Sequence, residues 1–129
     1  MIAARLQAAV LGVGQITIAG LYGGPDILVR YPLKPGQVSA VVWIDSFGPL
    51  WLLSFLAVGF WLMSTVVRRR GFVAAHIASA GLWAFYSGCV LMSAFLTEPP
   101  VPVLAGTFAG LLALVNIAVA VGDAERGHR

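Results

Sequence analysis

Side chains that could do chemistry are few in the apolar part of this chain, and they lie far apart. His76, Cys89 and Met92 share one long apolar stretch, and Asn116 lies in the next. His76 follows the arginines at 68–70 by about one and a half helical turns, which predicts a position near the headgroups. We expect an interfacial or helix-bonded histidine rather than a functional titrating group. Cys89 and Met92 are one turn apart and offer soft sulfur ligands, but packing is the expected role of both.

The sequence lacks the residue clusters that catalysis and metal binding require. It shows no grouping of nucleophile, base and orienting residue, and no metal ligands at a recognisable spacing. Its single cysteine excludes an internal disulfide and a cysteine-based zinc site. We therefore predict no enzymatic activity, no catalytic residue and no bound cofactor or metal.

Uncharged polar and small residues are the more informative features. The amide of Asn116, in the middle of an apolar stretch, needs a hydrogen-bond partner on another helix or on another subunit. Small residues also recur at four-residue spacing, which allows close approach of helices in a membrane. The candidates for helix packing or subunit contacts are Ala80, Ala84, Gly88, Gly106, Gly110 and Asn116.

The composition explains why these residues should be placed by membrane helices. Of 129 residues, 60% are hydrophobic and 10% charged, whereas soluble domains carry about 25% charged residues. Residues 47–67 and 72–95 contain no Asp, Glu, Lys or Arg. As a helix, 47–67 would extend about 31 Å, which matches a bilayer hydrocarbon core of about 30 Å.

The remaining apolar stretches complete a four-span pattern. We predict an all-α membrane protein, a four-transmembrane-helix bundle in a single domain. The expected spans are approximately 4–21, 47–67, 72–95 and 103–121. A signal peptide is the competing interpretation of the first stretch, but the small residues expected before a cleavage site are poorly placed. Glycines at 12, 14 and 20 weaken this first helix.

The connection 24–46 is the one long loop, and it is predicted to lie outside the cell. Prolines make 24–36 extended and irregular. Residues 38–44 allow a strand, an interfacial helix or an upstream extension of the second span. Asp45 or Ser46 can cap a helix that starts near 47 with a proline in its first turn. Four aromatic residues flank the loop as an aromatic belt would, namely Tyr22, Tyr31, Trp43 and Trp51.

Charge distribution predicts the orientation. Basic residues of short loops stay on the cytoplasmic side, so the turn 68–71 is expected there, with Arg68, Arg69 and Arg70 as topology anchors. Both termini are then cytoplasmic. The inner side carries a net charge of +4 and the outer side −1. Because the basic residues gather at membrane boundaries, we expect no nucleic-acid partner.

The order of these features resembles that of small four-span membrane proteins of actinobacteriophages, grouped as holin-like. The resemblance rests on the Trp-containing span 47–67, the turn 68–71, Ala74-Ala75-His76 and the stretch 83–86. It implies a protein that accumulates in the bacterial plasma membrane, self-associates there as a homo-oligomer, and permeabilises or depolarises it. No catalytic residue can be carried over from that group.

Other functions fit the same features. The chain could be a non-enzymatic accessory or scaffold subunit of a larger membrane complex, with another membrane protein as its partner. A phage exclusion factor or a small-solute channel is also compatible with four apolar spans. In each case the lipid bilayer is the expected surrounding.

Overall fold

The computed structural model describes residues 2–29, 33–97 and 103–127, and these residues form helices and no strand. Four helices are long and apolar enough to cross a membrane. The predicted all-α, four-span fold is therefore confirmed, and the chain is a multi-pass membrane protein. The long helices are α1 (Ile2–Tyr22), α3 (Leu50–Arg68), α4 (Phe72–Leu96) and α5 (Leu104–Glu125). Two short helices, η1 (Asp26–Leu28) and α2 (Ala40–Asp45), lie in the long connection.

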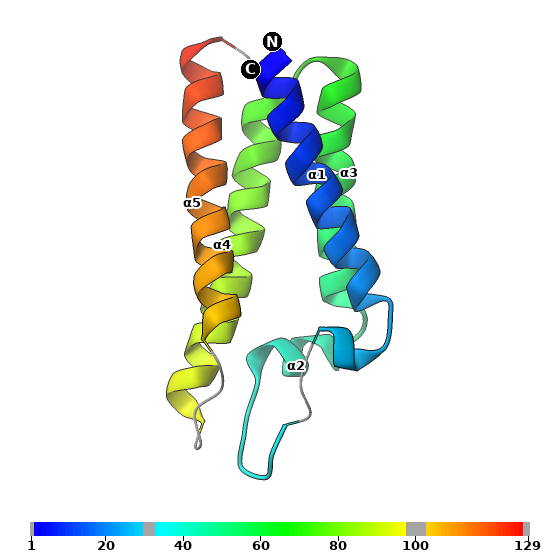
Figure 1. The fold of residues 1–129 in the computed structure, drawn as a ribbon, viewed down its shortest axis with the longest axis vertical. Coiled ribbons are helices and arrows are strands. Elements are labelled where there is room, and N and C mark those ends of the chain that lie inside the picture. Colours follow the sequence, from blue (N-terminus) through cyan, green and yellow to red (C-terminus); the bar gives the residue numbers. More distant parts are fainter. Residues whose placement is uncertain (1, 30–32, 98–102, 128–129) are drawn as a thin grey trace.

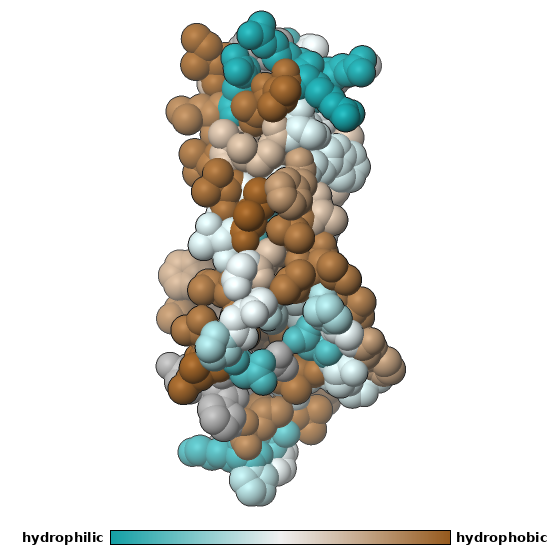
Figure 2. All heavy atoms as spheres, turned by 90° about the vertical axis from the view of Figure 1, so that its right-hand side faces the viewer, coloured by the Kyte–Doolittle hydropathy of each residue, from teal (hydrophilic) through white to brown (hydrophobic). Residues whose placement is uncertain are grey.

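The long helices form two closely packed pairs, α1 with α3 and α4 with α5, which meet mainly where α3 faces α4 (Figure 1). The first turn of α1, the α3–α4 turn and the last turn of α5 lie at one end of the bundle, here called the arginine end. The described residues of the connection, 23–29 and 33–49, lie at the opposite end, the loop end. Figure 2 shows hydrophilic side chains gathered at the arginine end and around the loop end, with a mostly apolar band between them.

The turn at the arginine end is tight because two residues adopt left-handed conformations. Arg69 has φ 56° and its backbone N–H donates to the Thr65 carbonyl at 2.7 Å, which closes α3. Gly71 follows with φ 81° and begins α4. Glycine adopts this conformation at little cost. The predicted turn 68–71 thus corresponds to residues 69–71, directly after α3.

Two helix ends differ from the predicted ones by three or four residues, and the others by no more than two. α5 continues through Gly122 and Asp123 to Glu125, beyond the predicted end at 121. The Arg126 side chain satisfies a terminal carbonyl there, since its Nε donates to the Gly122 oxygen at 2.9 Å. α3 begins at Leu50 rather than near 47, because Gly48 has φ 144° and interrupts the helix before the proline.

Residues 38–46 form neither a strand nor an extension of α3. Ser39 caps α2 by accepting from the Val42 N–H. Hydrogen bonds hold the segment against the end of α4. Thr97 Oγ1 accepts a hydrogen bond from the Val38 N–H and donates one to the Val38 carbonyl. Ser93 Oγ accepts from the Ala40 N–H at 2.8 Å. A separate short helix, one of the three predicted alternatives, is the observed one.

Most of the aromatic residues described near the loop end form a buried core between the helices and do not form an exposed aromatic belt. Trp51 is 2% exposed, and its Nε1 donates to the Val41 carbonyl at 2.9 Å. The Tyr22 hydroxyl donates to the Tyr86 hydroxyl, and Phe55 contacts Trp51, Tyr22 and Tyr86. Of the predicted belt residues, only Trp43 is largely exposed, and Tyr31 lies outside the described residues. The belt prediction was wrong for Trp51, because these rings fill the space between α1, α3 and α4.

Candidate functional site

A cluster of four buried polar side chains joins α1, α4 and α5. His76 Nδ1 lies 3.2 Å from Asn116 Oδ1, and both residues are 0% exposed. Asn116 Nδ2 also donates to the Leu112 carbonyl at 2.8 Å. Asn116 therefore has its inter-helix partner within the same chain, and His76 is a helix-bonded histidine buried in the bundle.

The second pair of this polar cluster connects α1 to α4. Gln15 Nε2 donates to Ser79 Oγ, and both side chains are buried. Ser79 lies one turn after His76 on the same buried face of α4. Three helices thus meet around Gln15, His76, Ser79 and Asn116, and the directional hydrogen bonds fix how each helix is rotated about its axis.

Two polar atoms of the cluster have further hydrogen-bonding capacity. His76 Nε2 and Gln15 Oε1 are buried and have no hydrogen-bond partner among the described residues. No group of three metal-ligating side chains occurs in the described part of the chain. The observed contacts of the cluster are hydrogen bonds between helices, and such contacts suit helix positioning. Sequence reasoning missed the Gln15–Ser79 and His76–Asn116 pairs because residues so far apart in the chain carry no pairing signal.

The candidate glycines of α5 lie against α4. A Cβ added to Gly106 would come within 3.0 Å of Val90 Cγ1, and one added to Gly110 within 3.1 Å of Ser87 Oγ. Ser87 Oγ also donates to the Gly106 carbonyl at 2.7 Å. This glycine pair therefore serves close packing within the chain.

The candidate small residues of α4, Ala80, Ala84 and Gly88, differ in burial. Ala80 is 6% exposed and packs inside, whereas Ala84 and Gly88 are exposed. A Cβ added to Gly88 would meet nothing within 4 Å. These two residues lie in a groove of about 510 Å³, here called the loop-end groove, which is also lined by Trp43, Phe85, Cys89 and Met92.

The two sulfur-containing residues of this groove differ in exposure. Cys89 is 8% exposed, whereas Met92 is 62% exposed and projects from the surface. Packing remains the expected role of both residues.

Sequence reasoning also missed a close contact between α1 and α3. A Cβ added to Gly59 would lie 2.8 Å from Ile16 Cγ1 and 3.1 Å from the Gly12 carbonyl oxygen. The two helices touch backbone to backbone at Gly12 and Gly59. The available signal was the four-residue spacing of Ala4, Ala8 and Gly12, the same spacing that identified the candidates in the other spans.

The topology anchors lie together at the arginine end. Arg68, Arg69 and Arg70 are exposed, and Arg5 and Arg126 belong to the helix ends beside them. The helical arrangement thus collects the basic residues of three segments at one surface.

Comparison of the chain with protein-family models, curated proteins and solved structures finds no match.

Proposed function

We propose that this protein is a holin-like, self-associating protein of the bacterial plasma membrane, with both termini in the cytoplasm, that permeabilises or depolarises that membrane. The observation that supports this proposal is the exposed position of Ala84 and Gly88 in the loop-end groove. The other small residues of the predicted set, Gly106 and Gly110, contact α4 within the chain.

Exposed small residues have a specific physical meaning in a membrane. Lipid tails are as apolar as aliphatic side chains, so association of helices depends on close packing rather than on removal of apolar surface from water. Because Ala84 has only a methyl group and Gly88 has no side chain, the backbone of a second copy can approach α4 closely at these two residues. The side chains around it, Phe85 and Met92, are exposed and would pack against the incoming helix.

Permeabilisation would belong to the assembly and not to the single chain. The polar cluster points into the bundle and leaves an apolar surface toward lipid. One copy therefore offers water no continuous polar path. To permeabilise the membrane, an assembly would have to open this bundle or align several copies. Because such an assembly forms only above a threshold concentration, depolarisation would begin abruptly.

The test is regulated expression in a bacterium while a voltage-sensitive dye reports membrane potential. The wild-type chain should accumulate harmlessly and then depolarise the membrane abruptly. Gly88→Leu fills the loop-end groove and should delay or abolish depolarisation at equal membrane abundance. Gly14→Leu is the matched control, because Gly14 also faces open space, on α1, and it should behave like the wild type.

The opposite results are equally informative. Tolerated accumulation of the wild-type chain without depolarisation would contradict the holin-like function and favour an accessory or scaffold subunit. Depolarisation by Gly88→Leu with unchanged timing would exclude the loop-end groove as the association surface.

A further inference from the structure

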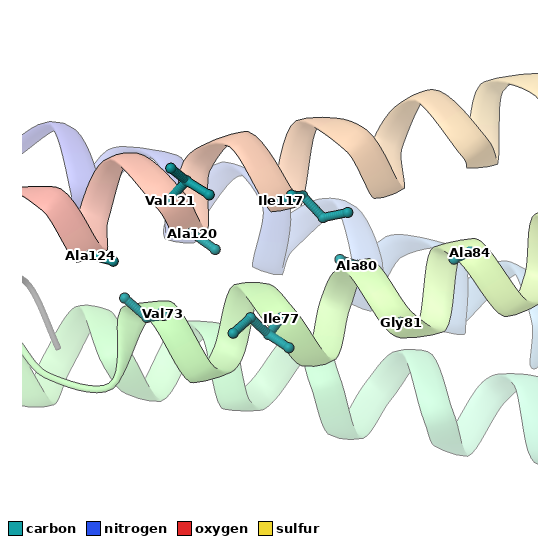
Figure 3. A pocket seen from close by; sticks show the side chains of 9 residues that line it. All are labelled: Val73, Ile77, Ala80, Gly81, Ala84, Ile117, Ala120, Val121 and Ala124. Atoms are coloured by element: carbon teal, nitrogen blue, oxygen red, sulfur yellow. The ribbon is translucent and has the colours of Figure 1, made fainter.

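The outer and inner sides of the α4–α5 pair differ in polarity. The outer side carries a groove of about 560 Å³ that is lined only by apolar residues and glycine. Figure 3 shows this groove, with Ile77 on α4 and Ile117 on α5 among its lining residues. His76 and Asn116, which directly precede these two isoleucines, are buried inside the bundle. Because apolar cavities stay dry, the inner side is where these helices can hold a small polar ligand.

The hydrogen bonds of Asn116 determine which nitrogen of His76 carries a hydrogen. Asn116 Nδ2 donates to the Leu112 carbonyl at 2.8 Å, so the amide nitrogen faces its own helix and Oδ1 faces the imidazole ring. An amide oxygen can only accept, and His76 Nδ1 lies 3.2 Å from it, so Nδ1 is the donor. In the uncharged ring, Nε2 is then an acceptor.

Gln15 provides a second buried acceptor near this ring. Its Nε2 donates to Ser79 Oγ, which leaves Oε1 as the acceptor of the amide. Gln15 is 1% exposed and His76 is 0% exposed. Neither Gln15 Oε1 nor His76 Nε2 has a hydrogen-bond partner among the described residues. Because an unsatisfied acceptor in an apolar interior is destabilising, both atoms require a donor.

The spacing of the two acceptors suits one small molecule. Ser79, the partner of Gln15, follows His76 by three residues on α4, and side chains at this spacing lie about 5–6 Å apart at Cβ. Two successive hydrogen bonds of about 2.8 Å span at most about 5.6 Å. A water molecule has two O–H donors, and buried waters typically satisfy polar groups that lack protein partners. Water therefore matches both the number of acceptors and their separation.

We propose that one buried water molecule bridges α1 and α4, donating one hydrogen bond to Gln15 Oε1 and the other to His76 Nε2. The bridge joins the Gln15–Ser79 pair to the His76–Asn116 pair. One hydrogen-bond network then connects α1, α4 and α5. The site lies within a single chain, so it does not depend on self-association.

The test is solid-state nuclear magnetic resonance of the full chain in phospholipid vesicles with ¹⁵N-labelled histidine. The measurement is made at about pH 8, where an ordinary imidazole is uncharged. His128→Gln leaves His76 as the only histidine, so the signals of the two ring nitrogens belong to this residue. Nδ1 should carry a hydrogen, Nε2 should carry none, and magnetisation should transfer from water protons to Nε2.

Gln15→Leu tests the second contact of the water. The variant removes Oε1 but keeps an apolar side chain of similar size, so the transfer from water to His76 Nε2 should be lost. Gln37→Leu makes the same substitution near the loop end, outside the polar cluster, and should leave the transfer unchanged. Circular dichroism verifies that both variants keep their helical content. The chain with Gln15 intact still decides the proposal if Gln15→Leu does not fold.

Four results would overturn the proposal. The first three are a hydrogen on Nε2 instead of Nδ1, absence of transfer from water to Nε2, and unchanged transfer in Gln15→Leu. The fourth is loss of the transfer in Asp123→Asn but not in Gln15→Leu, which would place the water beside the buried carboxylate of α5. Because the measurement reports on the interior of one chain, its failure is distinguishable from a failure of the depolarisation experiment.

Discussion

At the scale of the residue, the structure assigns the buried polar groups to helix positioning. Asn116 of α5 contacts His76 of α4, and Gln15 of α1 contacts Ser79, also of α4. In a bundle whose other side chains are mostly apolar, an inter-helix hydrogen bond is the interaction that depends most strongly on orientation. His76 and Asn116 together therefore fix the rotation of α4 against α5.

Asn116→Leu should destabilise the bundle by about 1 kcal/mol, because the variant leaves His76 Nδ1 buried without its partner. Unfolding in increasing sodium dodecyl sulfate, followed by tryptophan fluorescence, measures this loss. Thr107→Val is the matched control, since Thr107 is exposed and bonds only the Val103 carbonyl of its own helix. Equal stability of Asn116→Leu and the control would show that the His76 contact contributes nothing.

Gly59→Ala should destabilise the α1–α3 pair by about 1–3 kcal/mol, because the new Cβ would lie 3.1 Å from the Gly12 carbonyl oxygen and 3.2 Å from the Ile16 nitrogen. Backbone atoms cannot move aside as a flexible side chain can. Gly20→Ala adds the same methyl group to α1 in open space and should be neutral or slightly stabilising. The same detergent unfolding measurement compares the two variants, and similar midpoints would contradict the close approach.

At the scale of the element, the short helix α2 is held in place from outside. Its own length gives it little stability, since isolated helices need about 12 residues or more in water. The hydrogen bonds from Ser93 and Thr97 of the α4 end, with the Trp51 Nε1 bond to the Val41 carbonyl, supply the missing support. Residues 38–45 of the connection are therefore held in place by α3 and by the end of α4.

Thr97→Val keeps the side-chain shape but removes the hydroxyl that bonds both backbone groups of Val38. We expect faster amide hydrogen exchange over residues 38–45, with unchanged exchange in the middle of α5. Hydrogen–deuterium exchange mass spectrometry in detergent measures both regions. Thr107→Val again provides the control, and unchanged protection of α2 in Thr97→Val would show that Thr97 does not hold this helix.

At the scale of the whole molecule, the bundle brings the α3–α4 turn, the first turn of α1 and the last turn of α5 to one surface, the arginine end. This arrangement requires that these three segments lie on the same side of a membrane that the four helices cross. The arginines predict that this is the cytoplasmic side, because guanidinium groups in short loops are retained in the cytoplasm.

A cysteine at position 69 should be inaccessible to a membrane-impermeant maleimide in intact cells, and a cysteine at position 34 should react. Arg69→Cys and Lys34→Cys are made with Cys89→Ser, which removes the natural thiol. After permeabilisation both positions should react. Labelling of Arg69→Cys from outside intact cells would reverse the orientation and leave the fold unchanged.

The sequence by itself determined the number of membrane helices and their approximate positions. Span length and apolar character are local properties, so 72–95 could be matched to α4 (Phe72–Leu96) without knowledge of its neighbours. The turn after the second span was also predictable, because arginines and glycine mark it directly. Small residues at four-residue spacing indicated close packing, but not which helix would supply the partner.

Only the tertiary structure decided which face of each helix points inward. A membrane helix is apolar on all sides, so its hydrophobic pattern does not mark a buried face as it does in a soluble protein. Successive residues turn by about 100°, since there are 3.6 residues per turn. Ala80, Ala84 and Gly88 are four residues apart, so each is offset by only about 40° around α4 from the one before. Only the docking of the neighbouring helices decided that Ala80 is buried while Ala84 and Gly88 are exposed. The long-range pairs, Gln15–Ser79 and Gly12–Gly59, depend on helix docking for the same reason.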